Sequence, residues 1–239
     1  MNFHLFPKPV FCLFLITSAT INLPGCAEKG KDQRASAAVV KAEAVQANSK
    51  EVAPSTHDAR ISEYLCHQPD DCRSSVLGAT GREEAAWLQA NGYPSSAELA
   101  RLQQLSDSQL KAAADAGSVT ALAVYGQRLA LGSDTAKGLD ALSLAADRGS
   151  IYAYYGLSKV YAERQGLRNI VESGAYLRVA YTLGDNKAGS ALQATFPTLN
   201  PAENAAIDRR AASLYKTYAK GRAPRPRPIF AGRLSSGVR

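Results

Sequence analysis

Cysteine, histidine and aspartate gather in one short stretch of the sequence. Cys66 and Cys72 enclose the run from His67 to Asp71, which contains a proline and is typical of a turn. Such a turn brings the two sulfurs together, and a disulfide that closes a small loop contributes roughly 2 to 3 kcal/mol of stability. The alternative is a metal site built from Cys66, His67, Asp70 and Cys72, but their spacing is not a usual zinc spacing. The sequence therefore favours a disulfide.

The start of the chain has the layout of a secretory signal peptide. Lys8 precedes an apolar run over residues 10–16, and small and polar residues follow it. The apolar run is too short to span a bilayer as a stable helix. The sequence therefore predicts export to an oxidising compartment, where a disulfide persists.

The leader ends in Leu23, Pro24, Gly25 and Cys26, and this ending resembles the lipobox of bacterial lipoproteins. Pro24 stands where that family usually has a small residue. The resemblance implies cleavage after residue 25 and lipidation of Cys26. Alanine rather than aspartate follows the cysteine, which by the same resemblance implies delivery to the outer membrane, facing the periplasm.

Cysteine counting supports lipidation. If Cys26 carries lipid, Cys66 and Cys72 remain as an even pair in the exported chain. The alternative is an ordinary leader cut after Ala19, which would leave a soluble periplasmic protein with one unpaired thiol. Two or three acyl chains would anchor the protein stably in a membrane.

The sequence offers little for catalysis. Beyond the leader, the only histidines are His57 and His67. A Ser-His-Asp or Cys-His catalytic arrangement therefore has no histidine available in the chain after residue 67. No phosphate-binding glycine loop and no His-Glu-x-x-His pattern is present. We therefore expect no catalytic residue, no metal and no cofactor, and a binding protein rather than an enzyme.

The net charge of +7 comes from the ends of the chain. Residues 220–239 hold six basic residues and no acidic one, and without them and Lys8 the basic residues equal the 21 acidic ones in number. A nucleic-acid-binding domain carries its basic face on folded elements, so we expect no nucleic-acid partner. The tail has two interpretations: its arginines contact anionic lipid or an acidic wall polymer, or they merely keep the terminus soluble.

An internal repeat indicates the architecture. Residues 113–121 match residues 145–153, and residues 180–188 form a weaker third copy. The glycines at 117, 149 and 184 each follow an apolar helical stretch, where a left-handed C-cap would end one helix. Four residues after each glycine, a small residue begins the apolar face of the next helix.

These copies resemble Sel1-like repeats, a branch of the tetratricopeptide superfamily. Gly126 and Gly132 match two further glycines of that pattern in the first copy, whereas Ser158 replaces one of them in the second copy. The third copy lacks a recognisable second half, so the number of repeats is two or three. The resemblance covers the segment 113–192 and implies stacked helix pairs with a concave protein-binding face and no active site.

Helices are also expected on both sides of the repeats. The pattern predicts helices over 83–91 and 96–104, with Gly92 ending the first and Ser95 or Ser96 capping the second. Asn200, followed by a proline, predicts the start of a closing helix. The expected fold is all-α, a short α-solenoid, with this organisation: signal peptide 1–25, flexible tether 26–58, N-terminal helical cap region 59–105, Sel1-like repeats 106–198, capping helix 199–219 and disordered basic tail 220–239.

Tyrosines in the repeats divide into two groups. Tyr155 lies three residues after Tyr152 and four residues before Lys159, on a face offset from the apolar stripe. Tyrosine and basic side chains suit binding interfaces, so this trio is the candidate partner-binding site. We expect its tyrosines to contribute little to stability. The tyrosines assigned to core packing are Tyr125, Tyr161, Tyr176 and Tyr181.

Together these features predict a membrane-anchored periplasmic scaffold or adaptor that binds another envelope protein or peptide through helical repeats. The alternative is an envelope inhibitor or immunity-type lipoprotein that blocks a toxic exported enzyme.

Overall fold

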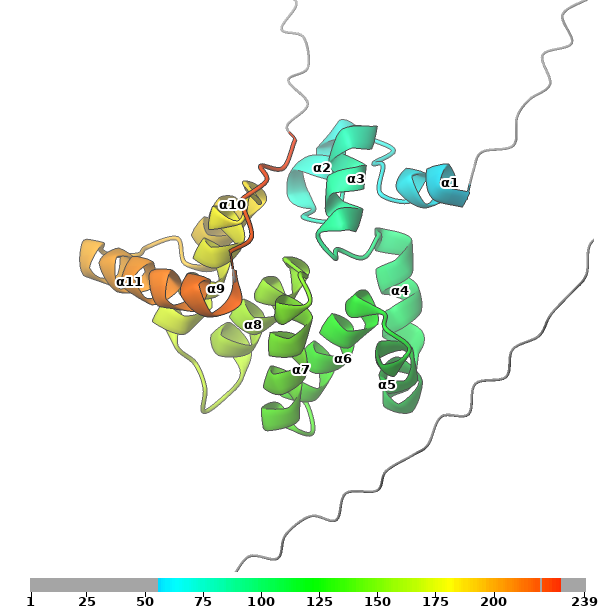
Figure 1. The fold of residues 1–239 in the computed structure, drawn as a ribbon. Helices are drawn as coiled ribbons and strands as arrows, with labels where there is room; N and C mark the ends of the chain where they lie inside the picture. The colour runs from blue at the N-terminus through cyan, green and yellow to red at the C-terminus, as the bar shows by residue number, and fades with distance from the viewer. Residues whose placement is uncertain (1–55, 220, 229–239) are drawn as a thin grey trace, which may run out of the picture. The chain divides into compact units, whose positions relative to one another are not determined.

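The computed structural model of the chain describes residues 56–219 and 221–228 (Figure 1). All the regular structure in these residues is helical, apart from one isolated bridge between Leu65 and Ala79, so the predicted all-α class is confirmed. The predicted signal peptide, the predicted lipidation site Cys26, most of the predicted tether and residues 229–239 lie outside the described residues. Within the described ranges, no helix is both long and apolar enough to cross a membrane.

The N-terminal part of the fold consists of short helices. Its second pair of helices, α3 and α4, agrees with the predicted ranges to within one residue, and the side chain of Ser95 caps α4 by accepting a hydrogen bond from the backbone of Glu98. The expected boundary between tether and folded region, at residue 58, falls inside α1. The helices are α1 (Thr56–Ser62), α2 (Pro69–Ser74), α3 (Arg82–Ala90) and α4 (Ser96–Gln104).

Antiparallel helix pairs follow. Helix α6 packs most extensively against α7, and α8 against α9, while α6 and α8 also contact each other directly. We call α6 to α9 the central helices. The bounds are α5 (Asp107–Asp115), α6 (Val119–Leu131), α7 (Thr135–Asp147), α8 (Tyr152–Glu163), α9 (Ile170–Thr182) and α10 (Lys187–Thr195).

The glycines of the repeat end three helices in the same way. Gly117, Gly149 and Gly184 have φ angles of +99°, +102° and +115°, a region that side chains disfavour. After each glycine, the next backbone N–H donates to the carbonyl five residues earlier, as in Ser118 to Ala113 and Ser150 to Ala145. This is the Schellman pattern, and it confirms the predicted left-handed C-caps.

Small residues let α6 and α7 approach closely. A Cβ atom on Gly138 would overlap the backbone of Ala130, and one on Gly126 would lie 2.8 Å from the backbone nitrogen of Leu142. Ala130 and Leu142 are fully buried between the two helices. The alanine and glycine content of this region therefore serves close helix packing, with few large side chains between the axes.

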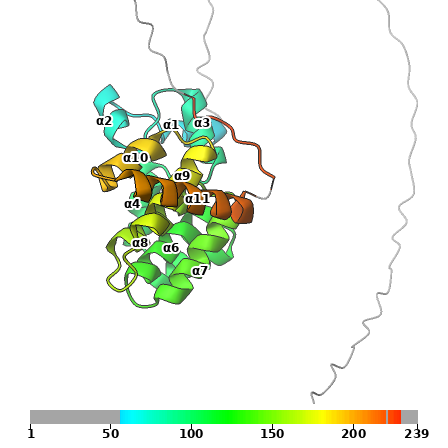
Figure 2. The ribbon, with the colours of Figure 1, turned by 90° about the vertical axis from the view of Figure 1, so that its left-hand side faces the viewer.

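Helix α11 (Pro201–Tyr218) packs along α9, and Figure 2 shows it lying across this side of the fold. Asn200 caps its start as predicted, in a reciprocal capping box with Glu203. Its buried face consists of Ile207, Ala211 and Leu214. The closing helix therefore covers the apolar side of α9.

Aromatic rings fill the space between α8, α9 and α11. Tyr176 is buried and stacks on Tyr161, with ring centroids 5.8 Å apart. Tyr181 is 49% exposed, so its assignment to the core is wrong. The inward face of α9 is taken by Tyr176, Val179 and Ala180, which lie three and four residues apart, and Tyr181 points away from that face.

Candidate functional site

The predicted trio on α8 does not form an exposed patch. Tyr155 is partly buried, and its hydroxyl donates to the carboxylate of Asp185. The ring of Tyr152 packs against that of Tyr93, with centroids 5.8 Å apart, whereas Lys159 is exposed. Of the three predicted contact residues, Tyr152 lines an open hollow between α4, α6 and α8. The expectation that Tyr155 contributes little to stability is therefore corrected, because its hydroxyl belongs to a buried hydrogen-bond network.

The hollow beside Tyr152 is a groove of about 370 Å³ between α4, α6 and α8, which we call the α4 groove. One wall is a single face of α6, formed by Val124, Gln127, Arg128 and Leu131 at spacings of three and four residues. Across from it lie Leu99 and Gln103 of α4, with Tyr152 and Gly132 completing the lining. The lining is mainly apolar, with amide groups that can hydrogen-bond a peptide backbone.

Arg128 positions α4 at the edge of this groove. Its guanidinium donates to the carbonyls of Leu102, Gln103 and Leu105 at the C-terminus of α4, with a distance of 2.8 Å to the Gln103 oxygen. The same group lies 3.2 Å from the carboxylate of Asp107. A cation at a helix C-terminus satisfies its free carbonyls and complements the helix dipole. The guanidinium of Arg128 is therefore bonded to the C-terminus of α4, and its aliphatic stem lines the groove.

A second hollow, of about 610 Å³, lies on the other side of α4. The hydroxyl of Tyr64 donates to the carbonyl of Tyr93 at its edge, and burial is the main cause that raises the pKa of Tyr64 above its usual value. Glu63 accepts hydrogen bonds from Ser95 and Arg101 at 2.8 and 3.4 Å. The two hollows make α4 a ridge, with an apolar groove on one side and a mixed-charge one on the other.

The disulfide between Cys66 and Cys72 is present, as predicted. Because both sulfurs are used in this bond, they are not thiolate ligands, and the alternative metal site at Cys66, His67, Asp70 and Cys72 is not formed. Among the residues that the structure describes, no group of three or more metal-ligating side chains comes together.

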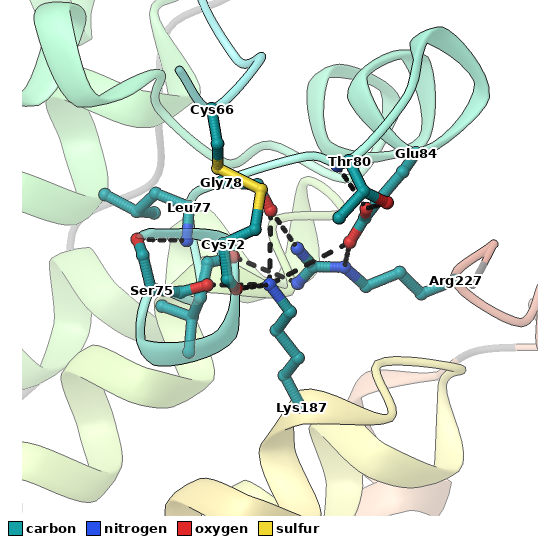
Figure 3. Close-up of a disulfide and its surroundings, with 10 residues drawn as sticks. Cys66, Cys72, Ser75, Leu77, Gly78, Thr80, Glu84, Lys187 and Arg227 are labelled. Carbon is teal, nitrogen blue, oxygen red and sulfur yellow. Dashed lines mark hydrogen bonds and ion pairs between the residues drawn. A yellow bond between two sulfur atoms is a disulfide. The ribbon is translucent and has the colours of Figure 1, made fainter. Parts of the chain in front are cut away.

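A buried ionic cluster that the sequence did not reveal lies beside the disulfide loop (Figure 3). Its centre is Arg227, whose side chain is fully buried. The Arg227 Nε donates to Glu84 at 2.7 Å, one terminal nitrogen donates to Asp185 at 3.3 Å and to the Val76 carbonyl at 2.9 Å, and the other donates to the Gly78 carbonyl at 2.8 Å. We call the site formed around this guanidinium the arginine socket.

Other donors hold both carboxylates of the socket. Glu84 accepts hydrogen bonds from the backbone and hydroxyl of Thr80 at 2.7 and 2.8 Å, and Asp185 accepts from the hydroxyls of Tyr93 and Tyr155. Burial alone would raise the pKa of the Glu84 carboxyl, but the bonds from Thr80 and Arg227 outweigh burial and lower it. Burial, with the negative charge of Asp185, raises the pKa of Tyr155. In the socket, the ionised form of Glu84 is therefore stabilised, and Tyr155 stays neutral.

Lys187 links the disulfide loop to the start of α10. Its ammonium donates to the carbonyls of Cys72, Ser75 and Gly78 at 2.7, 2.7 and 3.2 Å. Burial, together with the nearby charge of Arg227, lowers the pKa of Lys187. The loop thus offers a row of carbonyl oxygens to two cations.

Residues 221–228 of the basic tail, which the sequence predicts to be disordered or extended, contain no helix and are held against the fold. This segment, which we call the C-terminal strap, is extended and carries the buried Arg227, while residues 220 and 229–239 lie outside the described part of the chain. Its prolines prevent helix formation, as expected, but two carboxylates and two carbonyls compensate the guanidinium and fix the segment.

One signal in the sequence could have indicated the socket. Asp185 occupies the position that Ser118 and Ser150 hold in the other copies of the repeat, where serine caps the next helix. Lys187 likewise replaces Thr120 and Tyr152. The third copy thus departs from the pattern at the positions where its side chains enter the ionic cluster.

Comparison of the chain with protein-family models, with curated proteins and with solved structures gives no match. The resemblance to Sel1-like repeats therefore rests on the sequence pattern alone.

Proposed function

We propose that the chain is a membrane-anchored periplasmic scaffold in which a short solenoid of Sel1-like helix pairs presents the α4 groove to a segment of another envelope protein. The observation that carries this proposal is the groove itself: an open, mainly apolar hollow whose wall is one face of α6. Partly exposed apolar side chains in a hollow are a typical feature of protein interfaces.

The lining indicates the chemistry of the partner segment. Leu99, Leu131 and Val124 offer an apolar surface, and Gln103 and Gln127 offer amides for backbone hydrogen bonds. The one charged group, Arg128, is already bonded to α4 carbonyls. A segment with apolar side chains and few charges fits this groove better than an acidic or basic one.

A photo-crosslinking amino acid at position 127 tests the groove in intact envelopes. We expect a discrete crosslinked product, identified by mass spectrometry, that is lost when Leu131→Lys places a charge in the groove. The control position is 137, because Lys137 is exposed on α7. The same products from both positions, or none from position 127, would reject the groove as the binding site. Capture of a toxic exported enzyme would assign the protein as an inhibitor instead of a scaffold.

Membrane anchoring is tested separately. Cys26 lies outside the described part of the structure. The proposal requires that labelled palmitate be incorporated into the wild-type chain and that this incorporation depend on Cys26. Incorporation that persists in Cys26→Ser would overturn the anchor and leave the binding groove unaffected.

A further inference from the structure

The C-terminal strap contacts the rest of the fold as a bound peptide contacts a receptor. One side chain, that of Arg227, is buried, while those of Pro224, Arg225 and Pro226 are exposed. Two backbone hydrogen bonds flank the buried side chain. The Arg227 N–H donates to the Gly184 carbonyl, and the indole N–H of Trp87 donates to the Arg225 carbonyl, both at 2.8 Å. Anchor side chains combined with backbone bonds are a common mode of peptide recognition.

The receptor side of this contact is built by other parts of the chain. Thr80 fixes the carboxylate of Glu84, and Tyr93 and Tyr155 fix that of Asp185, through bonds that do not involve the strap. The disulfide and Lys187 hold the loop that supplies the carbonyl oxygens. A site whose groups are already oriented binds its ligand at a lower entropic cost.

The geometry of the socket selects arginine. The acceptors of the socket bond to all three nitrogens of the planar guanidinium. The compact ammonium of lysine has a single nitrogen and cannot reach all of these acceptors. The Trp87 ring adds a cation–π contact, 5.7 Å from the guanidinium carbon to the ring centroid. Without Arg227, Lys187 would be the one cation left close to the carboxylates of Glu84 and Asp185 among the described residues.

The backbone contact is also specific. A Cβ atom on Gly184 would overlap the carbonyl of Arg225, so glycine is required for the strap to lie this close. Beside this contact, the strap leaves a hollow of about 680 Å³ that reaches Glu83, Ala90 and Leu183. The socket therefore fixes one arginine and its backbone and leaves room for different neighbouring side chains.

We propose that the arginine socket is a binding site for extended peptides that carry an arginine between prolines, and that the strap occupies it as a displaceable intramolecular ligand. A segment of another protein with the same chemistry would take the place of the strap. This site is separate from the α4 groove, and neither proposal depends on the other.

The first test uses the full chain with Arg227→Gly and a synthetic peptide with the sequence of residues 222–228. Trp87 is the only tryptophan of the chain and touches the strap, so its emission reports occupancy. We expect saturable binding of this peptide. A peptide with lysine in place of the Arg227 equivalent should bind at least about tenfold more weakly, because charge-assisted hydrogen bonds are lost.

The matched control is Arg225→Ala, which removes an exposed side chain and keeps the carbonyl that Trp87 uses. It should bind the peptide no better than the wild-type chain does. Equal binding of the arginine and lysine peptides to folded Arg227→Gly, or no binding of either, would overturn the proposal.

A second measurement uses the wild-type chain, in case Arg227→Gly does not fold. The peptide then carries a photo-crosslinking residue in place of Ala223, and we expect it to label α3 in competition with the strap. Excess unlabelled peptide should block labelling, and the lysine peptide should not. If Arg227→Gly is unfolded, the absence of such labelling alone overturns the proposal.

Discussion

The central helices and the arginine socket are held together in different ways. The central helices pack neighbour against neighbour through glycine and alanine, as at Gly138 on Ala130. In the socket, Arg227 bonds to Glu84 across 143 positions of the sequence and to Gly78 across 149. Local packing follows from a repeating pattern, whereas the socket depends on single polar side chains that the completed fold brings together.

The largest expected effect falls on the socket. Arg227→Ala leaves two buried carboxylates facing one ammonium, and breaking a buried ion pair by removing one partner costs roughly 3–5 kcal/mol. Urea unfolding at neutral pH measures this free energy. Arg225→Ala should lie close to the wild type, since its side chain is exposed. Equal losses for the two variants would mean that the socket does not hold the strap.

Removal of the disulfide should have the next largest effect. The double variant Cys66→Ala with Cys72→Ala is expected to lose roughly 2 to 3 kcal/mol, since the open chain gains entropy in the unfolded state. Hydrogen exchange should rise in the loop that supplies the carbonyls of Val76 and Gly78 before it rises in α6 and α7. A uniform rise would show that the two regions are not separate in stability.

Overpacking tests the central helices. Gly138→Ala places a methyl group against the backbone of Ala130, and inserted atoms of this kind cost about 1–3 kcal/mol. Gly189→Ala in α10 is the matched control, because its new Cβ would meet Tyr181 at an ordinary 3.5 Å. The control should gain about 0.5–1 kcal/mol from helix propensity. Thermal unfolding of the two variants should move in opposite directions.

The pH dependence of stability should come partly from Glu84. Its pKa is lowered in the folded state, so its contribution is complete above the unfolded pKa of about 4.3 and is lost as the pH falls through the folded value. We expect Glu84→Gln to show a shallower loss of unfolding free energy than the wild type between neutral pH and that acid range. Parallel curves would assign the acid sensitivity to other carboxylates.

The smallest expected difference separates two tyrosines. Tyr155→Phe removes a hydroxyl that donates to buried Asp185, and leaving such a group with one partner fewer costs about 1–3 kcal/mol. Tyr181→Phe should change stability by less than about 0.5 kcal/mol, because Tyr181 is exposed. If the two variants melt alike, the hydroxyl of Tyr155 has no stabilising role.

The local features of the fold could be predicted because their causes are local. Ser95 and Asn200 cap helices through contacts with residues only three positions away. The glycine C-caps likewise depend on the preceding helical turn and on a positive φ angle. Periodicity was less successful at Tyr181, because α9 presents apolar residues on more than one face and the spacing does not say which face is buried.

The socket could not be predicted from composition. Arg227 lies in a segment rich in proline and arginine, and such a segment usually stays solvated because it cannot bury apolar surface. Its burial depends on acceptors from the loop after α2, from α3 and from the turn before α10. Only the departure of Asp185 and Lys187 from the repeat pattern hinted that this region differs.

The strap also decides how the fold would respond to a pulling force. Arg227 lies near the C-terminal end of the described residues, yet it is bonded directly to Glu84 of α3, which lies near their N-terminal end. Tension between residues 56 and 228 would therefore reach Glu84 through only the first helices, α1 to α3, and the bonds of Arg227 would have to break before the helices from α5 to α11 were pulled apart. A stack of helix pairs without such a link would instead unravel from its ends, one pair at a time.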